Sequence, residues 1–234
     1  MGKVIDEPTY RERFYVFEDR EHAGKLLAEF LSRNLKKEEK ENSIVLAIPR
    51  GGVPVGCIIA NILRVPMDLV IVRKIPIPWD REAGFGAVTL AGDVIIEENI
   101  LDYLGIDKNT LKELIAEVLS EIKRREKIFR QDKGEIEVHR KNVILVDDGL
   151  ATGLTMMAAI KYVGRKNPSK IFIATPTASR GALERLKNHV DVIYCLNIRS
   201  EIPYFAVADA YKKWYDLTDK DVLEYLQKYG FLHK

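Results

Sequence analysis

The sequence is poor in the residues that build metal centres, disulfide frameworks and nucleophilic triads. Only two cysteines, Cys57 and Cys195, occur among 234 residues, and each lies in an apolar stretch where a buried thiol is typical. The four histidines are scattered among charged residues and form no Ser-His-Asp or Cys-His order. These shortages argue against a cysteine-ligated metal, a disulfide scaffold and a triad hydrolase.

The chain also lacks an excess of one charge and a long apolar run. Its formal net charge is +2 with 31% charged residues, so both signs are mixed, which argues against a general nucleic-acid binder. No window is long enough to span a bilayer, and residues 1–6 lack the apolar segment of a signal peptide. We therefore expect a cytoplasmic protein with no membrane partner and with no nucleic acid as its general partner.

Apolar strands and amphipathic helices alternate along most of the chain. Hydrophobic residues form 47% of the sequence, which allows a sizeable core. We expect strands at 43–49, 67–72, 143–147, 170–175 and 190–196, and helices at 19–35, 53–63, 110–130, 153–164, 180–187 and 219–229. This alternation predicts an α/β fold with a doubly wound, mainly parallel sheet and helices on both faces.

Several segments show weaker patterns. Residues 1–17 could form a short strand or an arm, and the charged residues 36–42 suggest a solvated loop. A short helix is expected at 99–104. Thr110 with Glu113 fits a capping box at the start of the longest helix.

Prolines and aromatic residues mark two irregular regions. Two prolines and a glycine predict an irregular loop at 73–84, and a hairpin of 85–90 with 94–97 follows it. Residues 197–216 carry several aromatic side chains, for which packing in the core is favoured over stacking on a ligand.

Residues 143–155 join a buried strand, two acids and a loop of small residues. Asp147 and Asp148 follow the strand at its carboxyl end, the edge at which ligands bind in open α/β sheets. Residues 151–155 then offer two hydroxyls and the backbone N–H groups of a helix start, which suit a phosphate. A carboxylate pair beside an anion cradle matches a sugar phosphate. The alternative is an ordinary strand, turn and capped helix.

Cations follow the first two expected strands of the core. Arg50-Gly51-Gly52 ends the first, and glycines let backbone N–H groups approach an anion closely. Arg73-Lys74 ends the second, at the same edge of the sheet. The alternatives are a plain glycine turn and solvated charge.

The stretch at 143–155 resembles the PRPP-binding motif of type I phosphoribosyltransferases, in which an apolar run and two acids precede a Thr-Gly-x-Thr loop. The resemblance implies a single domain over 1–234, with an α/β core at 43–196 and a small hood drawn from 1–20 and 197–216. It also implies a homodimer, and a mobile loop after Arg73-Lys74 that closes over the reaction centre.

The resemblance assigns a role to each motif residue. Asp147 and Asp148 would hold the ribose hydroxyls of PRPP, and Arg73, Lys74, Asp147 and Asp148 would be the catalytic residues. The 5′-phosphate would be bound by Ala151, Thr152, Gly153, Leu154 and Thr155. The pyrophosphate would be bound by Arg50, Gly51, Gly52, Arg73 and Lys74, with a cis peptide bond near Arg50-Gly51. The implied cofactor is Mg²⁺. The ion would be bound by PRPP and not directly by the protein, and it would contact Asp147 or Asp148 through water.

The implied activity is transfer of ribose 5-phosphate from PRPP to a nitrogenous base or amine, with release of pyrophosphate. The alternative is a protein on the same fold that senses PRPP or nucleotides and regulates transcription. Members of the family that act on 6-oxopurines carry Asp where this chain has Ala151, and Ala cannot accept a proton. Asp80 and Glu82 are candidate bases in the mobile loop, and the acceptor itself stays open.

Overall fold

Six parallel strands form the central sheet of the computed structural model, which describes residues 2–131, 133–202 and 204–232. The strand order is β1-β9-β8-β7-β2-β3. The strands are β1 (Lys3–Asp6), β2 (Ser43–Ala47), β3 (Met67–Leu69), β7 (Asn142–Val146), β8 (Lys170–Ser179) and β9 (Val192–Arg199). All five neighbouring pairs run parallel, so the predicted doubly wound α/β fold is confirmed.

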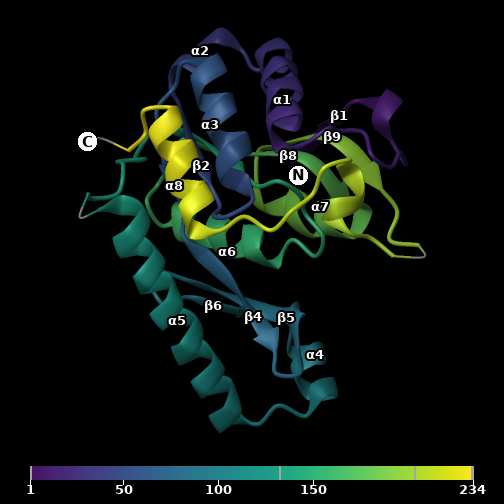
Figure 1. Ribbon diagram of the computed structural model, residues 1–234, viewed down its shortest axis with the longest axis vertical. Coiled ribbons are helices and arrows are strands. Elements are labelled where there is room, and N and C mark those ends of the chain that lie inside the picture. Colours follow the sequence, from purple (N-terminus) through teal and green to yellow (C-terminus); the bar gives the residue numbers. More distant parts are fainter. Residues whose placement is uncertain (1, 132, 203, 233–234) are drawn as a thin grey trace.

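Helices cover both faces of this sheet (Figure 1). One face carries α1 (Arg20–Asn34), α3 (Gly52–Leu63) and α8 (Asp219–Lys228). The other face carries α6 (Leu154–Gly164) and α7 (Arg180–Leu186). Alternate residues of each strand enter two separate cores: Val45 and Ile144 pack on the first face, and Ile44 and Leu145 on the second. This alternation explains why the strands read as unbroken apolar runs.

The order in which strands are added to the sheet reverses between β2 and β7: β3 follows on one side of this pair, and β8 and β9 follow on the other. Strands β2 and β7 pair in register from Ser43 with Asn142 to Ala47 with Val146. From β2 the chain passes through α3 on one face, and from β7 it passes through α6 on the other. The carboxyl ends of two such strands leave a crevice between their loops, which is where ligands bind in this class of fold.

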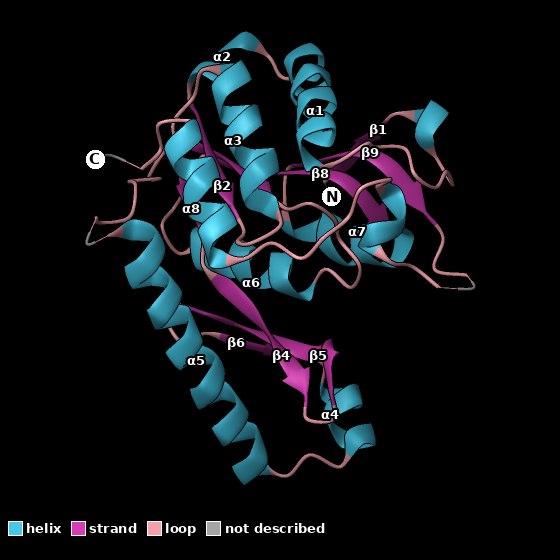
Figure 2. Cartoon of the chain, in the orientation of Figure 1, coloured by secondary structure: helices cyan, strands magenta, loops and turns pink. Residues whose placement is uncertain are grey.

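A second sheet projects from the first, as Figure 2 shows below the main body. It is antiparallel, in the order β4-β5-β6, from β4 (Val72–Ile77), β5 (Asp80–Thr89) and β6 (Val94–Ile96). The short α4 (Glu98–Leu104) follows, and α5 (Lys108–Arg130) then packs along β4 and β5. The hairpin of 85–90 with 94–97 and the helix at 99–104 are thereby confirmed.

The irregular loop predicted at 73–84 is wrong, because these residues form β4, a turn and the start of β5. Pro76 is accommodated since β4 is an edge strand and the register shifts on both sides of this residue. A proline at an edge or bulge removes no ladder hydrogen bond that the sheet needs. The side chains of Asp80 and Glu82, predicted as candidate bases, lie outside the described part of the structure.

Two smaller predictions are also wrong. The expected loop at 36–42 contains a short helix, α2 (Lys37–Glu41), because Glu39 accepts a hydrogen bond from the Lys36 N–H and caps its start. The long helix starts at Lys108 rather than Thr110, because the Asp107 carboxylate accepts the Asn109 and Thr110 N–H groups. The sequence thus predicted a side-chain cap for the long helix, but the capping residue is Asp107 and not Thr110.

A segment near the start of the chain pairs with a segment near its end. The segment with the 3₁₀ turn η1 (Pro8–Tyr10) pairs with the segment that holds η3 (Val207–Ala210), through a parallel bridge of Phe17 with Tyr211. A third 3₁₀ turn, η2 (Lys187–His189), ends α7. Among the described residues, no helix is long and apolar enough to cross a membrane. Cys57 and Cys195 are buried free thiols, as expected.

Candidate functional site

Two adjoining cavities open at the carboxyl ends of β2 and β7. The first, of about 340 Å³, is lined by Arg20, Arg50, Gly51, Arg73, Lys74, Arg125, Asp147, Asp148 and Thr155, among others. The second, of about 300 Å³, is lined by the loop after β7, including Ala151, Thr152, Gly153, Leu154 and Thr155. Both cavities share Lys74, Asp147, Thr155 and Val207. The predicted site residues therefore converge on one hollow, except Gly52, which is buried and lines neither cavity.

Asp148 is held by an ion pair that the sequence did not indicate. The Arg20 Nε donates to Asp148 Oδ2 at 2.7 Å, and both side chains are nearly buried. Arg20 also donates to the Tyr215 carbonyl and stacks on Trp214, with 3.9 Å from its Cζ to the ring centroid. On the other side, the Tyr211 hydroxyl donates to the Asp148 carbonyl at 2.6 Å. Asp148 is thus fixed by α1 and by the carboxyl-terminal segment.

The electrostatic environment of Asp147 differs from that of Asp148. Burial, and then repulsion from Asp148, raise the pKa of Asp147 well above its ordinary value. Its Oδ1 accepts the Asp148 backbone N–H at 2.9 Å, while the side chain faces both cavities. Hydroxyl donors or a cation brought by a ligand would offset this penalty on the charged carboxylate at the wall of the cavity.

The loop after β7 is pinned by its neighbour β8 and leads into a helix. Leu150 exchanges backbone hydrogen bonds with Thr177 and Ser179, and the Ser179 hydroxyl donates to the Ala151 carbonyl at 2.7 Å. Gly153 has a φ of 78°, the left-handed conformation that glycine adopts without strain, directly before α6. The loop therefore presents the start of α6 to the second cavity, as an anion site requires.

The turn after β2 packs directly against the acids. A Cβ atom on Gly51 would lie 2.1 Å from Asp148 Oδ2, and one on Gly52 would lie 2.5 Å from the Val146 carbonyl oxygen. Only glycine permits this approach. The peptide bond between Pro49 and Arg50 is cis, one bond before the position that the family resemblance implied.

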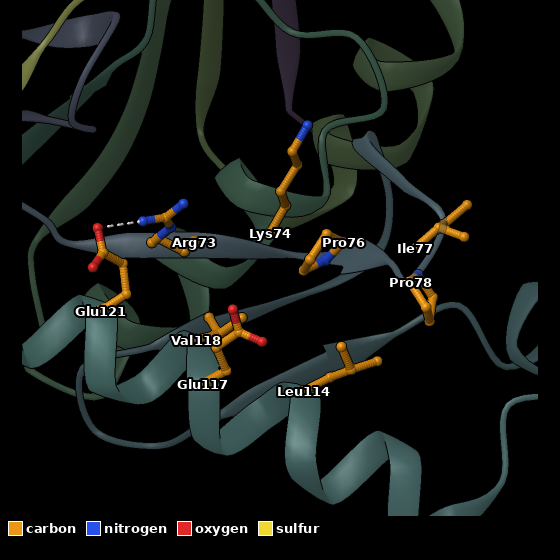
Figure 3. Close-up of a pocket in the computed structure, with 9 residues that line it drawn as sticks. All are labelled: Arg73, Lys74, Pro76, Ile77, Pro78, Leu114, Glu117, Val118 and Glu121. Atoms are coloured by element: carbon orange, nitrogen blue, oxygen red, sulfur yellow. Dashed lines mark hydrogen bonds and ion pairs between the residues drawn. The ribbon is translucent and has the colours of Figure 1, made fainter.

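Arg73 and Lys74 lie on opposite sides of β4 because successive side chains of a strand alternate. Figure 3 shows Arg73 turned toward the Glu121 side chain of α5, and its Nη1 donates to Glu121 Oε1 at 2.8 Å. Lys74 points away from α5, toward the main body, and lines both cavities of the site. A further pocket of about 240 Å³ lies between β4 and α5, with Arg73 and Glu121 at one end.

Sequence reasoning missed two arginines of the site. Arg20 and Arg125 lie in helices whose other charged residues are mostly solvated, and both are only 6% exposed. Arg20 meets Asp148 across 128 positions of the chain. No local pattern separates such a residue from an ordinary surface arginine, so a single sequence offered no signal for either.

The family assignment rests on more than these motifs. A family model described as the phosphoribosyl transferase domain matches residues 86–212, more than half of the chain. The chain therefore belongs to the phosphoribosyltransferase family, and the resemblance drawn from residues 143–155 is confirmed.

Relatives support the same assignment. The crystal structure of TT1426 from Thermus thermophilus is 34% identical, with a TM-score of 0.69 over 91% of this chain and 98% of that one. "Putative phosphoribosyl transferase Rv0571c" of Mycobacterium tuberculosis is 30% identical over 213 residues, which are 91% of this chain and 47% of the relative. A ribose-phosphate pyrophosphokinase from Pyrococcus furiosus is 38% identical over 64 residues, 26% of this chain and 23% of that protein. The chain spans about half the length of Rv0571c.

The contrast between the two acids predicts opposite effects on stability. Replacing Asp147 with Asn should raise the melting temperature at neutral pH. Folding raises the pKa of Asp147, so the contribution of Asp147 to the stability of the fold is complete below its ordinary pKa of 3.8. This contribution is lost as the pH rises through the raised pKa. The gain from Asp147→Asn should therefore be larger at about pH 7.5 than at about pH 4.5, as thermal unfolding followed by circular dichroism would measure.

Asp148→Asn provides the control for this prediction. It leaves Arg20 buried without its counter-ion, which typically costs about 3–5 kcal/mol. A stability loss in Asp147→Asn that equals the loss in Asp148→Asn would contradict the distinct environments of the two acids.

Proposed function

We propose that the protein transfers ribose 5-phosphate from PRPP to a nitrogenous base or amine and releases pyrophosphate. The observation that carries this proposal is the convergence of an acid pair, a helix-start loop and cationic groups on one hollow. PRPP carries a 5′-phosphate, ribose hydroxyls and a diphosphate, and each group finds chemistry that matches it. Membership in the phosphoribosyltransferase family supports the same reaction class.

Each part of the substrate would occupy a different part of the hollow. The 5′-phosphate would bind the loop of residues 151–155 at the start of α6. The ribose hydroxyls would donate to Asp147, which lines both cavities, and to Asp148, which lines the first. The diphosphate would face the turn of Arg50, Gly51 and Gly52, with Arg73 and Lys74 opposite. This order follows the spacing of the groups along the substrate.

The chemistry requires charge to be stabilised at both ends of a breaking bond. The bond from C1′ to the diphosphate oxygen breaks, and its electron pair leaves with pyrophosphate. The acceptor nitrogen donates a lone pair to C1′ and loses a proton. Positive charge that develops on the ribose would be stabilised by the buried acids, and Arg50, Arg73 and Lys74 would stabilise the leaving group. Fixed groups in a hollow need little reorganisation during this step.

Magnesium fits this arrangement as a companion of the substrate. Among the described residues, no group of three or more His, Cys, Asp or Glu side chains could hold a metal ion. Asp147 offers hard carboxylate oxygens that face both cavities, and Mg²⁺ commonly keeps several waters and binds one or two carboxylates with substrate phosphates. When bound, the ion would neutralise diphosphate charge. The chain's own residues would orient it through water.

Family resemblance also supports a homodimer and the hood formed by 1–20 and 197–216. Two contacts support such a hood: Phe17 pairs with Tyr211, and the Tyr211 hydroxyl donates to the Asp148 carbonyl. An acceptor bound above the ribose would therefore meet this paired region.

Sedimentation velocity tests the homodimer, and a monomer at micromolar concentration would refute it.

Asp147→Asn should weaken PRPP binding by about ten- to a hundredfold. A charge-assisted hydrogen bond contributes about 1.5–3 kcal/mol, and Asn cannot replace the lost charge. Titration calorimetry with PRPP and Mg²⁺ measures the change. Because this variant is expected to be the more stable protein at neutral pH, unfolding would not explain the loss. Unchanged affinity in Asp147→Asn and Asp148→Asn would end the proposal, whereas tight binding without turnover of any acceptor would favour a PRPP-sensing regulator.

Hypoxanthine, guanine and xanthine should be poor acceptors. The loop position at which 6-oxopurine enzymes of the family carry a proton-accepting Asp holds Ala151 in this chain. Pyrophosphate release would be measured with PRPP, Mg²⁺ and a panel of bases and amines. A kcat/KM above about 10⁴ M⁻¹s⁻¹ for guanine or hypoxanthine would show that Ala151 does not limit the acceptor.

A further inference from the structure

The projecting unit of β4–β6 and α5 brings a buried arginine into the site. Arg125 belongs to α5, which packs on β4 and β5 of the second sheet and also contacts α8. Its side chain nevertheless lines the 340 Å³ cavity that holds Asp147 and Asp148. Only 6% of Arg125 is exposed. A buried guanidinium at the wall of a cavity needs an anion to offset the loss of its hydration.

Arg125 is part of a cluster in which cations outnumber acids. Within the described part of the chain, four arginines, Arg50, Arg73, Arg124 and Arg125, share two carboxylates, Glu121 and Asp219. Three of these arginines, all except Arg124, line the cavity. The cluster therefore directs an excess of positive charge at the position proposed for the diphosphate.

The contacts of Arg125 are incomplete. Its Nε lies 3.3 Å from Glu121 Oε1 and 3.7 Å from Asp219 Oδ1, and this Nε makes no hydrogen bond with any described residue. Burial, and then repulsion from Arg73, lower the pKa of Arg125 to about 10, which leaves it charged at neutral pH. A buried charged donor without a hydrogen bond is uncommon in folded proteins, and Arg125 also borders the cavity.

Glu121 holds two of the arginines and has a separate partner of its own. Its Oε1 accepts from Arg73 at 2.8 Å and lies near Arg125. Arg124 donates two hydrogen bonds of 2.8 Å to the same carboxylate, from Nε and Nη2. Arg124 does not line the cavity. Glu121 would therefore stay paired and charged if Arg73 and Arg125 turned to another anion.

We propose that Arg125 binds the diphosphate group of the substrate, and that Glu121 occupies Arg73 and Arg125 until the diphosphate displaces it. The inference rests on the proposed function, because the anion is the leaving group of that reaction. It extends the site beyond the turn at Arg50 and the strand at Arg73 to a helix of the projecting unit. Glu121 then acts as a built-in competitor that lowers the affinity for free pyrophosphate.

The test is calorimetric titration of the full chain with inorganic pyrophosphate and, separately, with PRPP, each with Mg²⁺. Arg125→Gln should weaken both by tenfold or more, and Glu121→Gln should tighten pyrophosphate binding several-fold. The matched controls are Lys123→Gln and Glu113→Gln, which make the same charge changes on exposed positions of α5. Each control should stay within about twofold of the wild-type affinity.

The outcomes separate this inference from the proposed function. If the wild-type protein binds neither ligand, the proposed function fails and this inference fails with it. If the wild-type protein binds PRPP and Asp147→Asn weakens this binding as predicted, but Arg125→Gln matches Lys123→Gln, only the role of Arg125 is overturned. Unchanged or weaker pyrophosphate binding in Glu121→Gln overturns the role of Glu121. Should Arg125→Gln fail to fold, Arg125→Lys keeps the charge but loses the planar fork, and it should still weaken binding.

Discussion

The buried ion pair between Arg20 and Asp148 joins the elements that make the site. Asp148 follows β7, Arg20 begins α1, and the Tyr215 carbonyl and Trp214 ring that complete the contact come from the carboxyl-terminal segment. Gly51 packs against the same carboxylate from the turn after β2. Loss of either charged partner would leave the other buried and unpaired, so four separate segments depend on this one contact. The pair also leaves Asp147 to a ligand, because Arg20 is already committed to the neighbouring acid.

The position of the site follows from the order of the strands. β2 and β7 lie side by side, and their following helices leave on opposite faces of the sheet. Their turns diverge at that point, so the turn with Gly51 and the loop with Gly153 border a hollow rather than pack on each other. The two glycines serve different needs. Gly51 allows close approach to a carboxylate, whereas Gly153 takes a left-handed conformation that starts α6.

The projecting unit of β4–β6 and α5 supplies two of the cations at the site, Arg73 and Lys74. Strand β4 of the second sheet carries Arg73, which pairs with Glu121 of α5, and Lys74, which points toward the main body. The two side chains leave the strand in different directions, yet both line the first cavity. The pairing of β4 with β5 and the packing of α5 along both strands fix the backbone from which these cations project.

Much of the architecture could be predicted from local patterns along the chain. Unbroken apolar runs identified β2, β7, β8 and β9, and helical spacing identified α1, α3, α6 and α8. The acid pair and the loop at 151–155 were found because their residues are neighbours in the chain. The hairpin at 73–84 was missed, since a proline at an edge strand looks like a loop until its partner strand is known.

Which distant charges meet could be learned from the folded arrangement alone. Arg20 reaches Asp148, and Arg125 reaches the cavity from a separate unit, although both are ordinary helical arginines in the sequence. The different environments of Asp147 and Asp148 arise in the same way, because burial and a paired arginine distinguish two adjacent, chemically identical acids. Propensity, periodicity and capping are local, so the elements and the motif at 143–155 were already set by the order of the amino acids. Burial and long-range electrostatics depend on distances between remote segments, and those distances exist only in the folded chain.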